Sequence, residues 1–359
     1  MSSESLELSV LTRVEDGVGH ITLNRPRALN ALNRQMCELM TAALMAWRND
    51  PAVELVLLDH NGERGFCAGG DIRMIAESGA GDAMEAKAFF LTEYRLNHLM
   101  MVYPKPIVAI MDGIVMGGGV GISQPATIRI VTERTLYAMP ETGIGLFPDV
   151  GGGWHLPRLP GQSGLWLALT GARLRADECL ALGIATHYVE SVSLDALKVA
   201  LRAIPNDPKG VVERFDSDVG EARIEKNLRR IDRFFGHDTM EAIFADLASE
   251  ADGENWAFKE LRTLRRKSPQ AMKITLRQLR AGAAMNSFAE VMAMEYRLGG
   301  RTVRTHDFQE GVRAVIVDKD QDPRWNPAAL SGVTDALLDD IFAPLPTDQE
   351  WTPLPGITA

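Results

Sequence analysis

The chain has 359 residues, of which 46% are hydrophobic and 24% charged, as in an ordinary globular protein with a sizeable core. This length indicates one large domain with an appendage, or two domains. The formal net charge of -10 argues against a nucleic-acid-binding protein, which needs a basic excess to neutralise phosphates, but it allows an anionic small ligand.

Strand and helix patterns alternate along the first half of the chain. Glu15-Asp16-Gly17 separates two short strand patterns and predicts a hairpin. The predicted strands cover residues 6–14, 18–23, 53–58, 107–111, 126–131 and 135–137. The predicted helices cover residues 33–47 and 84–101, with a short helix after each of two glycine-rich turns. Because the alternation lasts to about residue 189, we expect an α/β layered core with repeated crossovers.

A change of character beyond residue 201 predicts a second region. Pro205-Asn206-Asp207-Pro208 is typical of a boundary. Ser268 before Pro269 fits an N-cap followed by proline at the first helical position. We therefore expect residues 1–204 to form an α/β core with the ligand site and residues 205–359 a helical C-terminal region. Its predicted helices are residues 221–235, 240–250, 254–266, 269–281 and 287–298.

Two runs of cationic side chains in the helical region are expected on solvated helix faces rather than at a ligand. They are Arg229, Arg230 and Arg233, and Arg262, Arg265, Arg266 and Lys267.

Two glycine-rich turns each follow a strand pattern and enter a helix. The first spans residues 60–72 and the second residues 116–121. The free N–H groups of a helix start point outward, and two of them can hold a developing oxyanion. Either turn alone is compatible with a tight turn and nothing more. The pair, followed by a carboxylate at position 141, favours a functional interpretation.

The chain is organised around the stretch of residues 137–153, where Glu141 and Asp149 stand among Met, Ile, Leu, Phe and Val. A carboxylate taken out of water must be hydrogen-bonded or change its pKa, and such groups gather where chemistry happens. Pro140 favours an extended residue before it, so Glu141 is expected just after a strand.

Glu93 is a third candidate, because it lies on an apolar stripe of the predicted helix 84–101. The alternatives are structural. Glu141 could cap a strand end, Asp149 could be the N-cap of a helix starting near residue 150, and Glu93 could lie at the surface.

Several common catalytic motifs are missing from the sequence, among them GxSxG, GxxxxGK[ST], HExxH and a complete GxGxxG. The cysteines Cys37, Cys67 and Cys179 are odd in number and far apart, which supports neither a disulfide framework nor a zinc site. They favour a reducing compartment. Residues 1–10 resemble neither a secretory signal nor a transit peptide, and no run of about 18 apolar residues occurs. We expect a cytoplasmic protein with no membrane partner and no metal.

These features resemble the crotonase superfamily of enoyl-CoA hydratases and isomerases. Residues 24–32, 66–72 and 117–119 carry the resemblance. The stretches 139–142, 144–153 and 156–159 are similar to the 3-hydroxyisobutyryl-CoA hydrolase branch, as are residues 92–94 and the helical C-terminal region. The likeness covers nearly the whole chain. It implies a spiral of ββα units with a helical C-terminal subdomain.

The resemblance also implies a role for each candidate residue. Backbone amides of Gly70 and Gly118 would form an oxyanion hole for a thioester carbonyl. Glu141 would be the principal catalytic carboxylate, while Asp149 and Glu93 would contact the acyl portion or its hydroxyl. CoA would be part of the substrate, with no separate cofactor. The residues expected to bind its pantetheine and adenine parts through backbone groups are Ala28, Ala68, Gly69, Asp71 and Ile72.

One position departs from the wider superfamily. Hydratases carry a second glutamate in the helix just after the glycine turn, and this chain has Gly121 there. Adding water across a double bond uses two carboxylates on one water molecule, so hydration is disfavoured. We expect hydrolysis of a short 3-hydroxyacyl-CoA, with 3-hydroxyisobutyryl-CoA of valine catabolism as the leading substrate.

Several alternatives stay open. The chain could be an enoyl-CoA hydratase or isomerase, or, in a different class, a non-catalytic acyl-CoA-binding protein. Glu141 could attack the thioester or activate water as a base. Members of the superfamily are often trimers, so a homo-oligomer is one expectation, although the additional helices leave the oligomeric state undecided.

Overall fold

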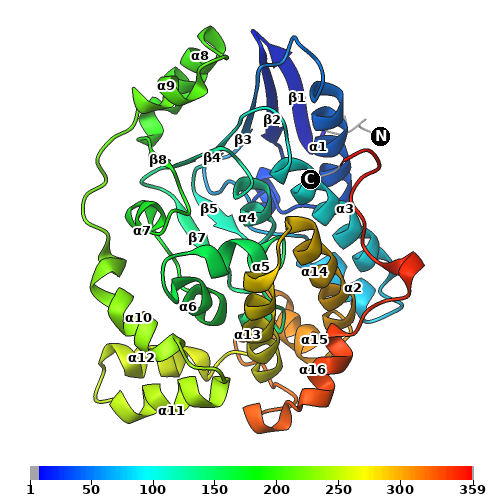
Figure 1. Cartoon of the computed structure of the whole chain (residues 1–359), viewed down its shortest axis with the longest axis vertical. Coiled ribbons are helices and arrows are strands. Elements are labelled where there is room, and N and C mark those ends of the chain that lie inside the picture. The colour runs from blue at the N-terminus through cyan, green and yellow to red at the C-terminus, as the bar shows by residue number, and fades with distance from the viewer. Residues whose placement is uncertain (1–7, 358–359) are drawn as a thin grey trace.

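A six-stranded sheet forms the core of the N-terminal half, with helices making up most of the remaining chain (Figure 1). The computed structural model describes residues 8–357. The strand order is β1-β2-β3-β4-β6-β8, and the pairs from β2 to β8 are parallel. A two-stranded parallel sheet joins β5 and β7. The strands are β1 (Val10–Glu15), β2 (Val18–Leu23), β3 (Leu55–His60), β4 (Ile107–Met111), β5 (Ile114–Met116), β6 (Ile128–Val131), β7 (Leu136–Ala138) and β8 (His187–Tyr188).

The predicted hairpin is confirmed, since β1 and β2 pair antiparallel from Val10↔Leu23 to Glu15↔Val18. Asp16 and Gly17 both have positive φ, 49° and 81°, as tight hairpin turns require. The first strand begins at Val10, later than predicted, and residues 6 and 7 of the predicted strand lie outside the described residues.

The helices of the N-terminal half follow the apolar periodicity. Asn33 caps α1 by accepting a hydrogen bond from the N–H of Met36 (2.9 Å), and α3 has the bounds predicted for it. Because the crossovers are helical, they bring the strand ends and helix starts to one edge of the sheet. These helices are α1 (Arg34–Trp47), α2 (Ile72–Gly79), α3 (Met84–Met101), α4 (Gly118–Ser123), α5 (Gly152–His155), α6 (Ser163–Thr170), α7 (Ala176–Ala181) and α8 (Leu194–Ala203).

The second half is helical, as predicted, with shifted ends. Residues 223–227 form a 3-10 turn before α10, and Ser268 caps α13 by accepting from the N–H of Ala271 (2.9 Å). Both α13 and α14 run past their predicted ends. The helices are α9 (Pro208–Glu213), α10 (Leu228–Phe235), α11 (Met240–Glu250), α12 (Trp256–Leu264), α13 (Pro269–Ala284), α14 (Phe288–Thr302), α15 (His306–Val312) and α16 (Asp335–Phe342).

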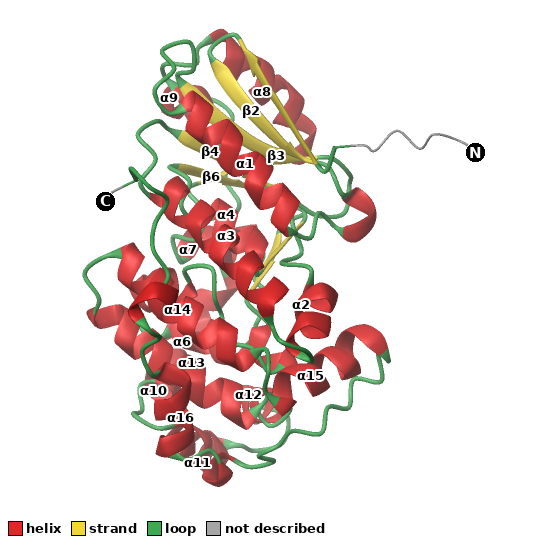
Figure 2. Cartoon of the chain, turned by 90° about the vertical axis from the view of Figure 1, so that its right-hand side faces the viewer, coloured by secondary structure: helices red, strands yellow, loops and turns green. Residues whose placement is uncertain are grey.

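The C-terminal helices pack onto segments of the core (Figure 2). Helix α14 contacts α3 and α5, α13 contacts α5, and α15 contacts α2. These contacts bring residues of the C-terminal half next to the central stretch of the chain. Among residues 8–357, none of the helices combines the length and apolar composition needed to cross a bilayer.

Candidate active site

The two glycine-rich turns lie against each other. The N–H of Cys67 donates to the carbonyl of Ile114 (3.0 Å), and the N–H of Met116 donates to the carbonyl of Cys67 (3.0 Å). Gly69 and Gly117 have positive φ, 119° and 46°, which favours glycine at both positions. A side-chain carbon on Gly117 would fall 3.3 Å from the Cα of Gly69. The close approach places the backbones of both turns at one site.

Two main-chain N–H groups point away from these pairings. Leu32 donates to the carbonyl of Gly69 (2.7 Å) and accepts from the N–H of Asp71 (2.8 Å), so the N–H of Gly70, between them, faces the other side. Gly118 is the first residue of α4, where an N–H has no partner inside the helix. Both Gly70 and Gly118 line one cavity, an arrangement that suits an oxyanion hole.

Three buried carboxylates line the same cavity, whose volume of about 570 Å³ is typical of small-molecule sites. Glu93 comes from α3, Glu141 from the first position of the 3-10 turn Glu141–Ile144, and Asp149 from the segment before α5. Their exposed fractions are 2%, 6% and 6%. A side-chain carbon on Gly118 would lie 2.7 Å from Oε1 of Glu93, which therefore faces the second glycine turn.

Burial governs the protonation of these carboxylates. It raises the pKa of Glu141 well above its ordinary value, and the charge of Asp149 raises it further. The same two causes raise the pKa of Glu93, and burial raises the pKa of Asp149 to about 6. Within residues 8–357, Oε1 of Glu93 and Oε2 of Glu141 have no hydrogen-bond partner. Such oxygens are costly to bury, and they are typical of sites where substrate or water supplies the partner.

The structural alternatives for these carboxylates are wrong. Helix α5 begins at Gly152 with Gly151 at its cap position, so Asp149 is not its N-cap. Glu93 is buried rather than at the surface. The buried side chain of Glu141 faces the cavity with an unpaired oxygen instead of capping a strand.

Tyr94 is a site residue for which the sequence indicated no role. Its hydroxyl donates to Oδ2 of Asp149 (2.7 Å), and this hydrogen bond opposes the effect of burial on the pKa of Asp149. The two residues are 55 positions apart, and no local pattern connects them.

We expect Tyr94→Phe to lower kcat about tenfold, as for loss of a hydrogen bond to a charged group. It should also raise the pKa of Asp149, because burial then acts without the opposing hydrogen bond, and the pH–rate profile should change accordingly. Measuring thioester cleavage against pH tests both effects. Tyr103→Phe is the matched control, because its hydroxyl donates to the carbonyl of Leu44 (2.8 Å) outside the cavity. An unmoved profile with unchanged kcat in Tyr94→Phe would contradict the role.

The residues expected to bind CoA divide into two groups. Ala68, Gly69 and Ile72 line the cavity together with Gly70, whereas Ala28 and Asp71 are not among its lining residues. Ala28 is the last residue of an exposed 3-10 turn. The next residue, Leu29, accepts a hydrogen bond at its carbonyl from the N–H of Ala68 (3.0 Å), which brings this turn next to the first glycine-rich turn. The Oδ2 atom of Asp71 lies 3.4 Å from a guanidinium nitrogen of Arg25.

The expectation that Arg266 and Lys267 lie only on a solvated helix face is wrong. Both residues line the cavity, together with Arg173. The N–H of Ser268 donates to the carbonyl of Thr142 (3.1 Å), which ties this segment to the residue after Glu141. Burial lowers the pKa of Lys267 to about 8, and its charge lowers that of Glu141. The local charge at the cavity is therefore mixed, despite the acidic chain.

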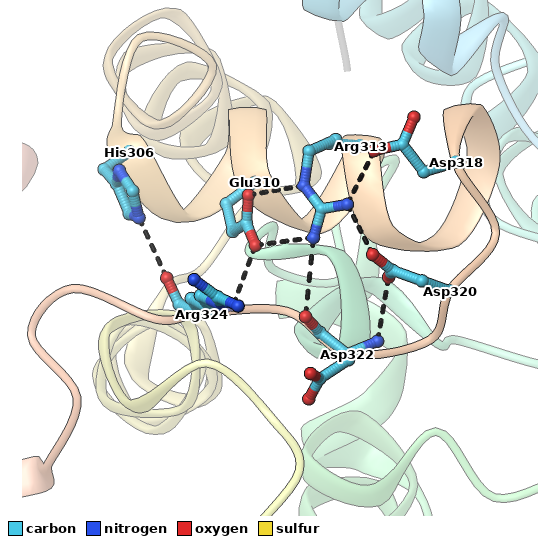
Figure 3. Close-up of polar contacts among 7 residues, drawn as sticks. All are labelled: His306, Glu310, Arg313, Asp318, Asp320, Asp322 and Arg324. Carbon is cyan, nitrogen blue, oxygen red and sulfur yellow. Dashed lines mark hydrogen bonds and ion pairs between the residues drawn. The ribbon is translucent and has the colours of Figure 1, made fainter.

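Another part of the cavity wall comes from residues 313–324, near the C-terminal end of α15. Figure 3 shows how this segment is held: the guanidinium of Arg313 donates to Glu310, Asp318 and Asp320 at 2.6–2.9 Å. The N–H of Arg324 also donates to Glu310 (2.8 Å). No sequence signal placed this segment at the site. Its lining residues are Val315, Ile316, Gln321 and Pro323.

Among residues 8–357, no three His, Cys, Asp or Glu side chains are grouped so that they could hold a metal ion. The polar groups of the cavity are instead carboxylates, cations and main-chain N–H groups. This set can bind a carbonyl oxygen, attack or deprotonate next to it, and transfer protons.

Comparison with known proteins places the chain in a family. The family model described as enoyl-CoA hydratase/isomerase matches residues 18–342. The chain is 46% identical over 346 residues to "3-hydroxyisobutyryl-CoA hydrolase, mitochondrial" of Gallus gallus, covering 94% of this chain and 89% of that protein. The protein of the same name in Homo sapiens is 43% identical over 345 residues, covering 94% of this chain and 89% of that protein.

Two solved structures match at 40% identity. A carnitinyl-CoA dehydratase from Mycobacterium thermoresistibile has a TM-score of 0.90 and covers 96% of this chain and 98% of its own. An enoyl-CoA hydratase from Rhodobacter sphaeroides 2.4.1 has a TM-score of 0.88 and covers 96% of this chain and 99% of its own. The crotonase fold expected from the sequence is confirmed. The chain belongs to the enoyl-CoA hydratase/isomerase family.

Proposed function

We propose that the chain is an acyl-CoA thioester hydrolase that cleaves a short 3-hydroxyacyl-CoA, with 3-hydroxyisobutyryl-CoA as its leading substrate. Relatives bearing that name are 46% and 43% identical to the chain over almost its whole length. This substrate would place the enzyme in valine degradation.

The observation that carries the proposal is that other residues fill the position where a side chain at Gly121 would lie. A side-chain carbon on Gly121 would lie 2.5 Å from Cβ of Val150 and 3.0 Å from the amide nitrogen of Asn97. The turn that presents Asp149 therefore occupies the place where a hydratase would carry its second glutamate. The carboxylate of Asp149 reaches the cavity from a different segment than the second glutamate of a hydratase. This arrangement favours hydrolysis over addition of water to a double bond.

In the proposed reaction, the N–H groups of Gly70 and Gly118 hold the thioester oxygen as it gains negative charge. Loss of one such donor typically raises the barrier by about 2.7–4 kcal/mol. The positions are preorganised, because Gly70 lies in a strand-like pairing and Gly118 starts a helix.

Glu141 then acts in one of two ways. In the first, its carboxylate attacks the thioester carbon, the C–S bond breaks, and the CoA thiolate is protonated and leaves as the thiol. Water then cleaves the mixed anhydride, which releases the acid and restores Glu141. Alternatively, Glu141 takes a proton from water, the hydroxide attacks the same carbon, and the C–S bond breaks to release the acid and the CoA thiolate. Asp149 orients the 3-hydroxyl or protonates the departing thiolate, and Glu93 contacts the acyl portion. The protein groups suffice for either route, with CoA entering as part of the substrate.

The testing experiment is a panel of short acyl-CoAs assayed for released thiol with a chromogenic reagent, alongside enoyl absorbance. We expect thiol release from 3-hydroxyisobutyryl-CoA and 3-hydroxypropionyl-CoA, with no loss of enoyl absorbance from crotonyl-CoA. Loss of enoyl absorbance without thiol release would replace the proposal with a hydratase. Binding of acyl-CoA without any turnover would instead support a non-catalytic binding protein.

A hydratase remains the second candidate, because the two solved structures at 40% identity are named as a dehydratase and a hydratase. Gly121 argues against a hydratase, because Val150 occupies the place where a side chain at this position would lie. Both solved structures cover nearly all of this chain, so measured activity decides more than overall similarity does.

Location and assembly remain predictions. The chicken and human relatives are named mitochondrial, whereas we expect a cytoplasmic protein; cell fractionation would decide. A homo-oligomer is proposed on the family likeness alone, and light scattering of the purified protein would test it.

A further inference from the structure

Glu295 of α14 is a buried carboxylate that the proposed reaction does not use. It is fully buried and is not one of the residues that line the cavity. Its Oε2 accepts a hydrogen bond from the N–H of Gly151 (2.8 Å), and its Oε1 accepts one from the N–H of Gly153 (2.8 Å). Both donors belong to the turn that carries Asp149.

Gln278 of α13 completes this arrangement. Its side-chain amide donates to the carbonyl of Pro148 (2.7 Å) and to Oε1 of Glu295 (3.0 Å). The two side chains therefore hold residues 148–153 at both ends, from helices that lie more than 120 positions away in sequence. Burial raises the pKa of Glu295 to about 8, and the hydrogen bonds from the N–H groups of Gly151 and Gly153 oppose this rise because they favour the ionised carboxylate.

The turn held in this way is strained. Val150, directly after Asp149, has a φ of 52°, and a β-branched residue rarely adopts this left-handed conformation. Such a conformation is unfavourable for a residue with a side chain and persists when its surroundings over-determine it. Gly151 follows with a φ of 93°. The hydrogen bonds to Glu295 and Gln278 supply the restraint that the strained backbone requires.

We propose that Glu295, together with Gln278, is a positioning residue that holds the turn of residues 148–153 so that Asp149 faces the cavity. The inference rests on the proposed function, because it gives the turn the task of presenting a catalytic carboxylate. Tyr94 fixes the carboxylate of Asp149 itself, whereas Glu295 fixes the backbone on which that side chain stands.

The test is a double-mutant cycle between Glu295→Gln and Asp149→Asn, measured as thiol release from 3-hydroxyisobutyryl-CoA. In Glu295→Gln, an amide N–H₂ faces a backbone N–H, so one hydrogen bond to the turn is lost. We expect kcat to fall at least about tenfold while KM stays within about twofold. In the Asp149→Asn background, the same change should alter kcat by less than about twofold, since the residue being positioned is already disabled.

A merely structural role for Glu295 predicts the same fold-loss in both backgrounds, and that result would overturn the inference. An unchanged kcat in Glu295→Gln would overturn it as well. Absence of thiol release by the wild-type protein would instead refute the proposed function. Gln278→Met, which leaves Glu295 intact, should show the same pattern more weakly and replaces Glu295→Gln if that variant does not fold.

The matched control is Glu260→Gln in α12. Glu260 is a partly buried carboxylate whose pKa burial also raises, and it accepts a hydrogen bond from Nε1 of Trp166 (3.1 Å). It is not among the residues that line the cavity, and its partner Trp166 belongs to α6 rather than to the turn. We expect its kcat to match the wild type.

Discussion

Glu141→Gln is expected to reduce thioester cleavage by about 10²–10⁴-fold, the usual range for loss of a general base, and by at least as much if Glu141 is the nucleophile. The amide keeps the volume of the side chain but can neither attack a carbonyl nor take a proton. The folded structure should persist, because the buried Oε2 of Glu141 has no hydrogen-bond partner to lose within residues 8–357. Steady-state kinetics with 3-hydroxyisobutyryl-CoA measure the loss.

Glu178→Gln provides the control for this prediction. Glu178 is a partly buried carboxylate that accepts a hydrogen bond from the N–H of Arg175 at the start of α7 (3.0 Å), away from the cavity. Its variant should keep the wild-type rate. Undiminished cleavage by Glu141→Gln would remove the basis of the proposed mechanism.

A separate experiment distinguishes the two roles of Glu141. A single turnover in heavy-oxygen water, followed by mass measurement of the peptide containing Glu141, locates the label. Label in the side chain supports the mixed anhydride, since water would cleave it at either carbonyl. Label found only in the product acid opposes the anhydride and supports the general base.

Asp149→Asn should lower kcat by about 10–100-fold and shift the acidic limb of the pH–rate profile to lower pH. Activity requires ionised Glu141, and its pKa is raised first by burial and then by the charge of Asp149. Removing that charge lowers the pKa of Glu141, so the remaining activity should persist to lower pH than in the wild type. A shift of the acidic limb to higher pH would contradict the assignment.

The same variant has a predicted effect on stability. Burial raises the pKa of Asp149 from 3.8 to about 6 in the folded state, so the folded state binds more protons than the unfolded state between these pH values. Stability from this group is therefore fully present below about pH 4 and lost as pH rises through about 6. Removing the charge should add up to about 3 kcal/mol to the free energy of unfolding at neutral pH. Denaturant unfolding at pH 4 and pH 7 tests this, with little difference expected at pH 4.

Such a gain in stability with a loss of activity would show that the carboxylates are retained for chemistry. The charge of the buried Asp149 raises the pKa values of both Glu93 and Glu141. A fold optimised only for stability would replace them with apolar or neutral residues.

Local sequence rules predicted much of the architecture. The bounds of α3, the turn at Asp16-Gly17 and the cap at Ser268 depend on contacts within about four residues, which the sequence displays directly. The bounds of β4 follow a continuous apolar run that is typical of a buried strand. The extended ends of α13 and α14 were missed because tertiary packing stabilises helical turns that propensity alone does not support.

The sequence by itself also determined the family and supplied the candidate groups of the site: two glycine turns, Glu141 with Asp149, and Glu93 on an apolar helix stripe. These are signals of residue type in an unusual setting, because glycine-rich turns and carboxylates among apolar residues are readable without a structure.

Only the tertiary structure decided which distant residues complete the site. The hydroxyl of Tyr94 donates a hydrogen bond to Asp149, and Glu295 accepts hydrogen bonds from the N–H groups of Gly151 and Gly153. Lys267 and the segment 313–324 line the cavity. Ala28 and Asp71 stay outside the cavity lining, although the family likeness pointed to them. The physical reason is that such contacts depend on how helices pack across the core, and no local periodicity encodes the partner of a side chain more than 50 residues away.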